Sequence, residues 1–434
     1  MKKILTIISL LLVIPIFSFS SQKTEIIPIS PFWSIPFILL LISIAVFPLI
    51  NKEWWDKNFQ YFSLFLGFIV VSYYLFFHNP PRVWGIFLEY FSFISLIGSL
   101  FVVSGGILIR TERKTTPFLN VLILFIGSVI SNLFGTTGAS MILIRPFLRI
   151  NRYRIKPYHV VFFIFLVSNI GGCLTPVGDP PLFLGYLEGV PFFWVIEHVW
   201  QIWLLTIILV LTIFFLIDYY HYSKLSKEAH PKKKVKFEIL GLHNLLFIVL
   251  ILTAVFTHTP FREIIMITSA IISYKFTNKE IHKENEFNFF PIEEVAILFA
   301  GLFATMIPAL DWLRLNGGKL GITVPGAFFW ATGTFSSFLD NAPTYLNFLS
   351  AAIGFKGMEV KNLLIHFPEY VVAISVAAVF FGAMTYIGNA PNFMVKSISE
   401  HQKINCPSFL EYMIKYSIPL LIPIFFSIWL LFFL

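Results

Sequence analysis

Long apolar segments alternate with short polar ones along almost the whole chain. Ten of them have the composition of membrane-spanning helices, at residues 32–50, 59–78, 84–109, 158–190, 199–218, 244–257, 263–276, 292–313, 363–397 and 413–433. A helix needs about 20 apolar residues to cross a ~30 Å hydrocarbon core, so segments 244–257 and 263–276 are each short for a span. The pattern predicts an all-α polytopic membrane protein with about ten transmembrane helices.

Two further apolar stretches, 117–146 and 323–352, are interrupted near their middles by small and polar residues. Basic residues flank the first stretch on both sides: Arg110, Arg113 and Lys114 before it, and Arg149, Arg152, Arg154 and Lys156 after it. Because Lys and Arg collect in cytoplasmic loops, both ends are predicted to be inside and the stretch to be a re-entrant hairpin. Continued along the chain, the same rule puts the basic loop 219–243 inside, the second hairpin on the outer side and the C-terminus outside.

The composition excludes several other classes of protein. Apolar residues make up 57% of the 434 residues and charged residues 12%, whereas soluble domains have about 25% charged residues. This excludes a soluble enzyme, a disordered chain and a fibrous protein, and the net charge of +8 is explained by topology without nucleic-acid binding. Residues 1–21 have the basic start, apolar run and small-residue end of a signal peptide, with an uncleaved first helix as the alternative.

The chain contains an internal repeat. Residues 172–183 (GCLTPVGDPPLF) and 382–393 (GAMTYIGNAPNF) are identical at five of twelve positions, at an offset of 210. Upstream, residues 135–140 parallel 339–344 at an offset of 204, in a register that a shift of two residues would also fit. Each half therefore has a broken hairpin followed by an interrupted helix. Because the hairpins enter from opposite sides, the halves are predicted to be inverted repeats, as in secondary transporters.

This repeat sets the expected organisation of the chain. Scaffold helices occupy 22–109 and 244–313, on either side of a first repeat core at 110–218 and the basic loop at 219–243. The first core contains the hairpin 117–146 and the interrupted helix 158–190. The second core, 314–434, contains the hairpin 323–352 and the interrupted helix 363–397.

The interruptions are expected to form a binding site. Glycine and proline open the helical hydrogen-bond ladder, here at Gly138, Gly178, Pro180, Gly388 and Pro391. Unpaired backbone groups are tolerated at membrane depth only inside protein or along a watery cavity. Helix C-terminal carbonyls suit a small cation, and helix N-termini suit an anion. The alternative is ordinary proline kinks in packed helices.

Two acidic residues lie at these interruptions. Asp179 precedes two prolines in the middle of a span, and Asp340 lies at the tip of the second hairpin. Carboxylates at that depth are costly and mark ion or proton sites. The alternative for Asp179 is a structural N-cap, because Asp followed by Pro favours a helix start.

Polar residues around the acids complete the candidate site. The candidates for ion or proton binding are Asn341, Thr136, Thr137, Thr175, Thr385 and Asn389, and the secondary candidates are Ser131, Asn132, Ser168, Asn169 and Glu89. The alternative for the hydroxyls is a hydrogen bond to their own backbone, and the alternative for Ser131, Asn132 and Ser168 is a link between helices. Glu89 is either a proton-path group or is solvated near the outer surface. Asp218, Asp311, His159 and Arg145 are expected at the membrane interface.

These motifs resemble the ion transporter superfamily. The stretch 168–180 is most similar to that of NhaD-type sodium/proton antiporters, and residues 340–343 (DNAP) resemble their hairpin tip. Arsenite permeases and divalent-anion symporters are related to them. The resemblance implies a homodimer with a scaffold part and a transport part, in which Asp179 and Asp340 handle sodium and protons. Two prolines at 180–181 depart from that family, which more often has small hydroxyl residues there.

The sequence therefore predicts a sodium/proton antiporter of the bacterial inner membrane, which works by alternating access without a cofactor. Sodium and protons are its expected ligands. The first alternative is a sodium-coupled di- or tricarboxylate carrier or an arsenite-type carrier. The second, a membrane-embedded enzyme, is disfavoured because the chain has neither a His-Glu-x-x-His nor a Gly-x-Ser-x-Gly motif.

Overall fold

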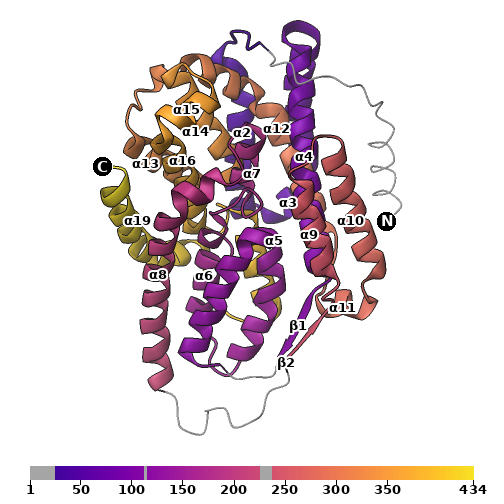
Figure 1. The fold of residues 1–434 in the computed structure, drawn as a ribbon, viewed down its shortest axis with the longest axis vertical. Coiled ribbons are helices and arrows are strands. Elements are labelled where there is room, and N and C mark those ends of the chain that lie inside the picture. The colour runs from indigo at the N-terminus through magenta and orange to yellow at the C-terminus, as the bar shows by residue number, and fades with distance from the viewer. Residues whose placement is uncertain (1–24, 112–114, 225–236) are drawn as a thin grey trace.

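The computed structural model describes residues 25–111, 115–224 and 237–434, which are almost entirely helical (Figure 1). The predicted signal peptide at 1–21 and most of the basic loop lie outside these residues. The elements, in chain order, are η1 (Pro31–Ser34), α2 (Ile35–Ile50), α3 (Lys52–Tyr73), η2 (Tyr74–His78), α4 (Pro80–Gly105), β1 (Leu108–Thr111), α5 (Pro117–Asn151), α6 (Pro157–Leu166), η3 (Ile170–Gly172), α7 (Pro180–Leu187), α8 (Trp194–Ser223), β2 (Phe237–Leu240), α9 (Asn244–Ala254), α10 (Phe261–Phe276), α11 (Lys279–Glu284), α12 (Phe290–Asn316), η5 (Gly317–Leu320), α13 (Pro325–Phe338), α14 (Asn341–Lys356), α15 (Val360–His366), α16 (Pro368–Phe381), η6 (Gly382–Met384), α17 (Ala390–His401), α18 (Phe409–Tyr412), η7 (Met413–Ser417) and α19 (Ile418–Phe432).

The described helices confirm an all-α polytopic membrane protein. Seven are long and apolar enough to cross a bilayer, or eight if the bent pair α15 and α16 is one span. The other predicted spans are built from shorter pieces. Helices α9 and α10 have only 11 and 16 residues, and the two interrupted helices are each divided into halves.

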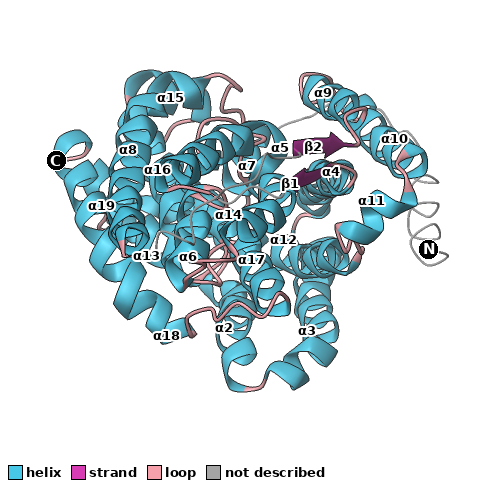
Figure 2. Ribbon diagram, turned by 90° about the horizontal axis from the view of Figure 1, so that it is seen from below, coloured by secondary structure: helices cyan, strands magenta, loops and turns pink. Residues whose placement is uncertain are grey.

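One side of the molecule is formed by α3, α4, α9, α10 and α12, and the other by α8, α13, α16 and α19, with α5, α7 and α14 between them (Figure 2). On the first side, Phe93 of α4 stacks on Phe299 of α12 at 4.8 Å between ring centroids. A short antiparallel pair of strands, β1 and β2, connects α4 with α9, in the register Leu108↔Leu240. The sequence pattern did not predict these strands.

The first hairpin is α5, which folds back on itself at Gly135. This glycine has φ 73° and ψ 155°, a left-handed φ that a residue with a side chain rarely adopts. The two arms run antiparallel and bring the ends of α5 together. There the side-chain amides of Asn120 and Asn151 exchange two hydrogen bonds of 2.9 Å. The hairpin continues to Asn151, five residues beyond its expected end.

The second hairpin is made of α13 and α14, which meet at Leu339 and Asp340. Phe335 and Phe348 hold its arms together, with ring centroids 5.8 Å apart. Helices α13 and α14 lie in the upper half of Figure 1 and α5 in the lower half, so the two hairpins enter from opposite ends. Their tips meet near the middle of the molecule.

Each hairpin is accompanied by an interrupted helix. In the first, the chain leaves helical geometry after Leu166, and α7 begins at Pro180; in the second, the gap lies between Phe381 and Ala390. The second interrupted helix starts at Pro368 and not at 363, because α15 is turned by 104° from α16. Pro368 has no N–H to donate, which suits the first turn of a new helix.

Candidate functional site

Asp179 lies where both hairpin tips and both interrupted helices meet. Only 1% of the residue is exposed. Its carboxylate accepts hydrogen bonds from the Thr136 hydroxyl at 2.6 Å, the Asn341 amide at 2.6 Å and the Asn389 amide at 3.0 Å. The donors come from the tip of the first hairpin, the tip of the second hairpin and the break in the second interrupted helix. One carboxylate therefore joins all four elements.

The same point is where four helices begin. Thr136 starts the second arm of α5 after the Gly135 turn, and Asn341 is the first residue of α14. Asp179 and Asn389 are the N-cap residues of α7 and α17. Helix N-termini carry partial positive charge from unpaired N–H groups, so this arrangement favours a negative charge.

Close backbone contacts hold the first break against the first hairpin tip. The Thr136 N–H donates to the Gly178 carbonyl at 2.8 Å. The Thr175 hydroxyl donates to the Asn132 carbonyl at 2.6 Å and accepts from the Gly178 N–H at 3.0 Å. A Cβ at Gly178 would lie 2.2 Å from the Gly172 carbonyl oxygen, so a side chain has no room there.

The second repeat uses equivalent contacts. The Thr385 hydroxyl donates to the Ser337 carbonyl at 2.5 Å and accepts from the Gly388 N–H at 3.2 Å. Thr175 and Thr385, expected as ligand candidates, thus use their hydroxyls to tie each break to its hairpin. Their partners are the carbonyls of residues 132 and 337, so the offset between the two hairpins is 205 residues, one more than the 204 predicted from the sequence. Thr136 is therefore equivalent to Asn341, and both donate to Asp179.

An asparagine network extends from the carboxylate into the second interrupted helix. Asn389 also donates to the Ser168 carbonyl at 3.1 Å and to the Asn169 side chain at 3.3 Å. Asn169 in turn donates to the Asn392 side-chain oxygen at 2.7 Å. These bonds link the two interrupted helices across 220 residues of sequence. Asn392, which the sequence offers only as a lesser candidate because it follows Pro391, is a member of this network.

The other secondary candidates link helices. The Ser131 hydroxyl donates to the Val167 carbonyl at 2.7 Å, and the Asn132 amide to the Gly171 carbonyl at 2.6 Å. The Ser168 hydroxyl lies 2.8 Å from that of Ser140. These contacts hold the first hairpin on the first interrupted helix.

The two acids differ in their surroundings. Asp179 occupies an N-cap position, but its side chain makes no capping bond to its own helix. Asp340 is half-buried, and its carboxylate accepts the Ala342 N–H at 3.0 Å, which caps α14. The structural explanation considered for Asp179 therefore describes Asp340 instead, and the buried carboxylate at the meeting point is Asp179.

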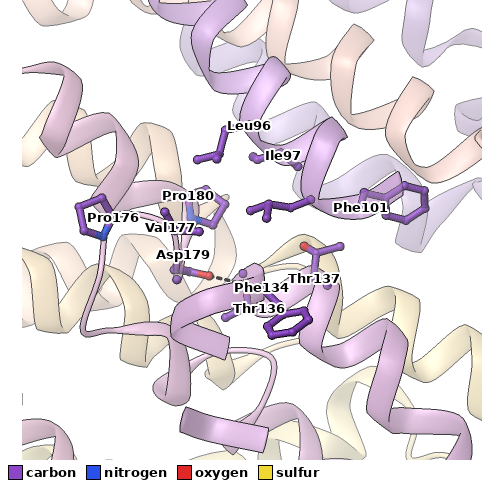
Figure 3. Close-up of a pocket in the computed structure, with 14 residues that line it drawn as sticks. Leu96, Ile97, Phe101, Phe134, Thr136, Thr137, Pro176, Val177, Asp179 and Pro180 are labelled. Atoms are coloured by element: carbon purple, nitrogen blue, oxygen red, sulfur yellow. Dashed lines mark hydrogen bonds between the residues drawn. The ribbon is translucent and has the colours of Figure 1, made fainter. Parts of the chain in front are cut away.

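A small cavity opens beside Asp179 (Figure 3). Leu96, Ile97 and Phe101 of α4 line one side, and Thr136 and Thr137 line the other, with Asp179 between them. The space open to the centre of a water molecule is about 20 Å³, enough for one or two waters. None of the residues lining this cavity is Lys or Arg.

Several charged residues expected at the interface are buried in ion pairs instead. Asp218 is fully buried and accepts hydrogen bonds from Arg154, from Tyr158 at 2.7 Å and from Asn120 at 3.0 Å. His159 is also fully buried, with Nε2 at 3.2 Å from the same carboxylate. The partners of Asp218, which lies on α8, come from α5, α6 and the turn after α5, so position along a predicted span could not reveal them.

Asp311 and Arg145 were also expected at the interface. Asp311 is 1% exposed, and it accepts a hydrogen bond from Arg82 at 2.9 Å. Arg145 is 5% exposed, and its Nη2 lies 3.2 Å from the carboxylate of Glu286, whose side chain is largely exposed.

Comparison with known proteins assigns a family. A family model described as "Putative citrate transport" matches residues 27–433. The chain belongs to this family. No curated protein matches the chain. The match spans both hairpins and both interrupted helices, so the whole architecture described above is that of a multi-pass membrane transport protein of this family.

Proposed function

We propose that the protein is a secondary carrier of a small citrate-like carboxylate, coupled to a cation. The observation that supports this most is the meeting of four helix N-termini at one buried point in a chain of the citrate-transport family. N-terminal helix ends are the backbone's anion-binding groups, and transporters place them at the midplane site. We therefore prefer the carboxylate carrier, which the sequence analysis named as the first alternative, to the sodium/proton antiporter.

The same point offers oxygen ligands for a cation. The Asn341 side-chain oxygen is buried and has no hydrogen-bond partner among the described residues, while the amide nitrogen of Asn341 donates to Asp179. A buried acceptor without a donor costs about 1–3 kcal/mol. A sodium ion between this oxygen and the Asp179 carboxylate would remove that cost, because carboxylate and carbonyl oxygens suit hard cations.

The cavity beside Asp179 has room for only one or two waters, so a citrate-sized anion needs a wider conformation of the protein. Alternating access supplies one, because the hairpins and interrupted helices move against the scaffold helices in such transporters. Binding of sodium at Asp179 neutralises its charge and lets the helix N-termini act on the anion. The cation is thereby a condition for anion binding, which is the basis of coupled transport.

Reconstituted proteoliposomes test the proposal. We expect labelled citrate to accumulate when an inward sodium gradient is applied, and not with an equal gradient of choline. Absence of sodium-driven citrate uptake by folded protein would reject a sodium-coupled citrate carrier.

A sodium/proton antiporter is the second candidate. Two acids at the breaks and a cavity lined by Asp179 without Lys or Arg favour it. It predicts that sodium collapses a preset pH gradient in the same liposomes without citrate. The carboxylate carrier predicts that sodium alone leaves the gradient unchanged.

The assembly and placement of the protein follow from the same proposal. We expect a homodimer in the bacterial inner membrane, with the scaffold helices between protomers and the C-terminus outside. The distribution of basic residues around the first hairpin supports this orientation.

A further inference from the structure

Arg145 is a buried guanidinium that is only partly paired. It lies on the second arm of α5, and its side chain is 6% exposed. Its Nη2 donates to Glu286 at 3.2 Å, whereas its Nε and Nη1 are buried and have no hydrogen-bond partner among the described residues. Unpaired donors on a buried charged group are costly. This guanidinium can therefore take a further acceptor.

The one ion-pair partner of Arg145 is easily displaced. Glu286 lies in the turn between α11 and α12, and its side chain is 68% exposed. Its single contact uses one N–H of the guanidinium, although a carboxylate can accept two in parallel. An exposed carboxylate also gains little from an ion pair. A carboxylate from solution that reaches the unpaired donors can therefore take the place of Glu286.

The segment around Glu286 packs on the end of α4 and reaches the site. Asn285 donates to two backbone carbonyls at the end of α4, both at 2.9 Å. The ring of Phe287 lies against that of Phe101, with centroids 5.4 Å apart. Phe101 also lines one side of the small cavity of the site (Figure 3). The pair of Phe101 and Phe287 therefore connects the cavity with the segment that holds Arg145.

The second arm of α5 presents Arg145 toward α4. Gly138 faces α4, because a Cβ there would lie 2.5 Å from the Ser104 hydroxyl, and it also lines the cavity. Arg145 follows seven residues later, on the same helix face and about 10 Å nearer the predicted cytoplasmic end. The Ser104 hydroxyl is buried and has no hydrogen-bond partner among the described residues. Polar groups thus follow the contact between α4 and α5 from the cavity to Arg145.

We propose that Arg145 is a second anion site, which binds a small di- or tricarboxylate at the cytoplasmic end of the contact between α4 and α5. The anion displaces Glu286 and accepts from the donors that are otherwise unpaired. Glu286 is its competitor, because the carboxylate of α4, Glu89, is half-buried and lies twelve residues before Phe101, toward the other end of that helix. A place for this anion on the route to Asp179 rests on the proposed function, whereas its binding at Arg145 does not.

Thermal unfolding of the purified protein in sodium-free choline buffer tests the second site. Under the proposed function the central site needs sodium, so citrate that stabilises the protein in choline is bound elsewhere. We expect choline citrate to raise the melting temperature of the wild type above its value in choline chloride of equal ionic strength. In Arg145→Gln the apparent Kd for citrate should rise about tenfold or more. Arg152→Gln removes the same charge from an exposed side chain at the end of α5 and should keep the wild-type Kd.

Glu286→Gln tests the competition, and its effect has the opposite sign. Without the competing carboxylate, the apparent Kd for citrate should fall about threefold or more. Glu280→Gln removes an exposed carboxylate from α11 and should leave the Kd unchanged. A purely structural ion pair predicts a less stable Glu286→Gln with no gain in citrate binding. This variant decides the matter if Arg145→Gln does not fold.

Three results would overturn the proposal. They are no effect of citrate on the wild type in choline, an unchanged Kd in Arg145→Gln, and stabilisation by phosphatidylglycerol micelles but not by citrate, which would assign Arg145 to a lipid headgroup. None of these measurements needs transport. Their failure is therefore distinct from an absence of sodium-driven citrate uptake, which would reject the proposed function.

Discussion

At the residue scale, the site depends on how one carboxylate is held. Asp179 is buried and accepts three hydrogen bonds, none of them from its own helix. A carboxylate held in this way can exchange a donor for a cation without breaking a helix. Asp340 cannot do so as readily, because its carboxylate caps α14.

Thr136→Val removes one of the three donors to Asp179 and keeps the shape of the side chain. A hydrogen bond to a charged group is worth about 1.5–3 kcal/mol, so we expect sodium-driven uptake to fall about tenfold or more. Thr136→Ser keeps the hydroxyl and should stay within about twofold of wild type. Equal uptake by the Val and Ser variants would show that this bond has no part in transport.

At the element scale, the interrupted helices and hairpins were visible in the sequence because glycine, proline and polar residues stand out in an apolar run. Thr136, Asn341 and Asn389 could be grouped with Asp179 as candidates, and the repeat offset of 210 relates Asn389 to it. That all three donate to this one carboxylate, from positions 43, 162 and 210 residues away, was not visible, because no local pattern encodes such contacts. The capping role of Asp340 was missed for a related reason, since it depends on the backbone angles at the tip.

Gly178→Ala tests the packing of the first break. The new Cβ would lie 2.2 Å from the Gly172 carbonyl oxygen, and backbone cannot yield as a side chain does. We expect a loss of about 1–3 kcal/mol or more in stability, measured as a lower melting temperature and a lower folded yield in detergent. Gly318→Ala is the control, because its Cβ would meet nothing within 4 Å. Similar melting of both variants would contradict the packing described here.

Asp218→Asn tests the base of the first hairpin. It leaves Arg154 buried without its ion-pair partner, which costs about 3–5 kcal/mol. Glu411→Gln, which breaks an exposed pair of 2.6 Å with Lys415, should cost about 0–1 kcal/mol. Thermal unfolding of the two purified variants gives the comparison, and equal melting temperatures would mean that the buried network does not stabilise the hairpin.

At the scale of the whole molecule, the two hairpins enter from opposite ends and meet at one point (Figure 1). That arrangement agrees with the inverted repeat found in the sequence. The equivalent hydrogen bonds of Thr175 and Thr385 to hairpin carbonyls show which residues of the two halves correspond. The orientation in the membrane rests on the basic residues alone.

Labelling of single cysteines tests that orientation, after Cys173 and Cys406 are replaced by alanine. We expect an impermeant maleimide to label Leu434→Cys on intact cells, and Ser226→Cys only after lysis, because the basic loop is predicted to be inside. The reverse pattern would invert the topology.

The central claim is that Asp179 binds the coupling cation, and sodium-driven citrate uptake by Asp179→Asn tests it most directly. The amide keeps the size of the side chain but removes the charge, so we predict that uptake falls to the level of empty liposomes while the protein remains folded. Glu293→Gln, at an exposed position in the first turn of α12, should transport as wild type. Sodium-dependent uptake at the wild-type rate in Asp179→Asn would contradict the claim.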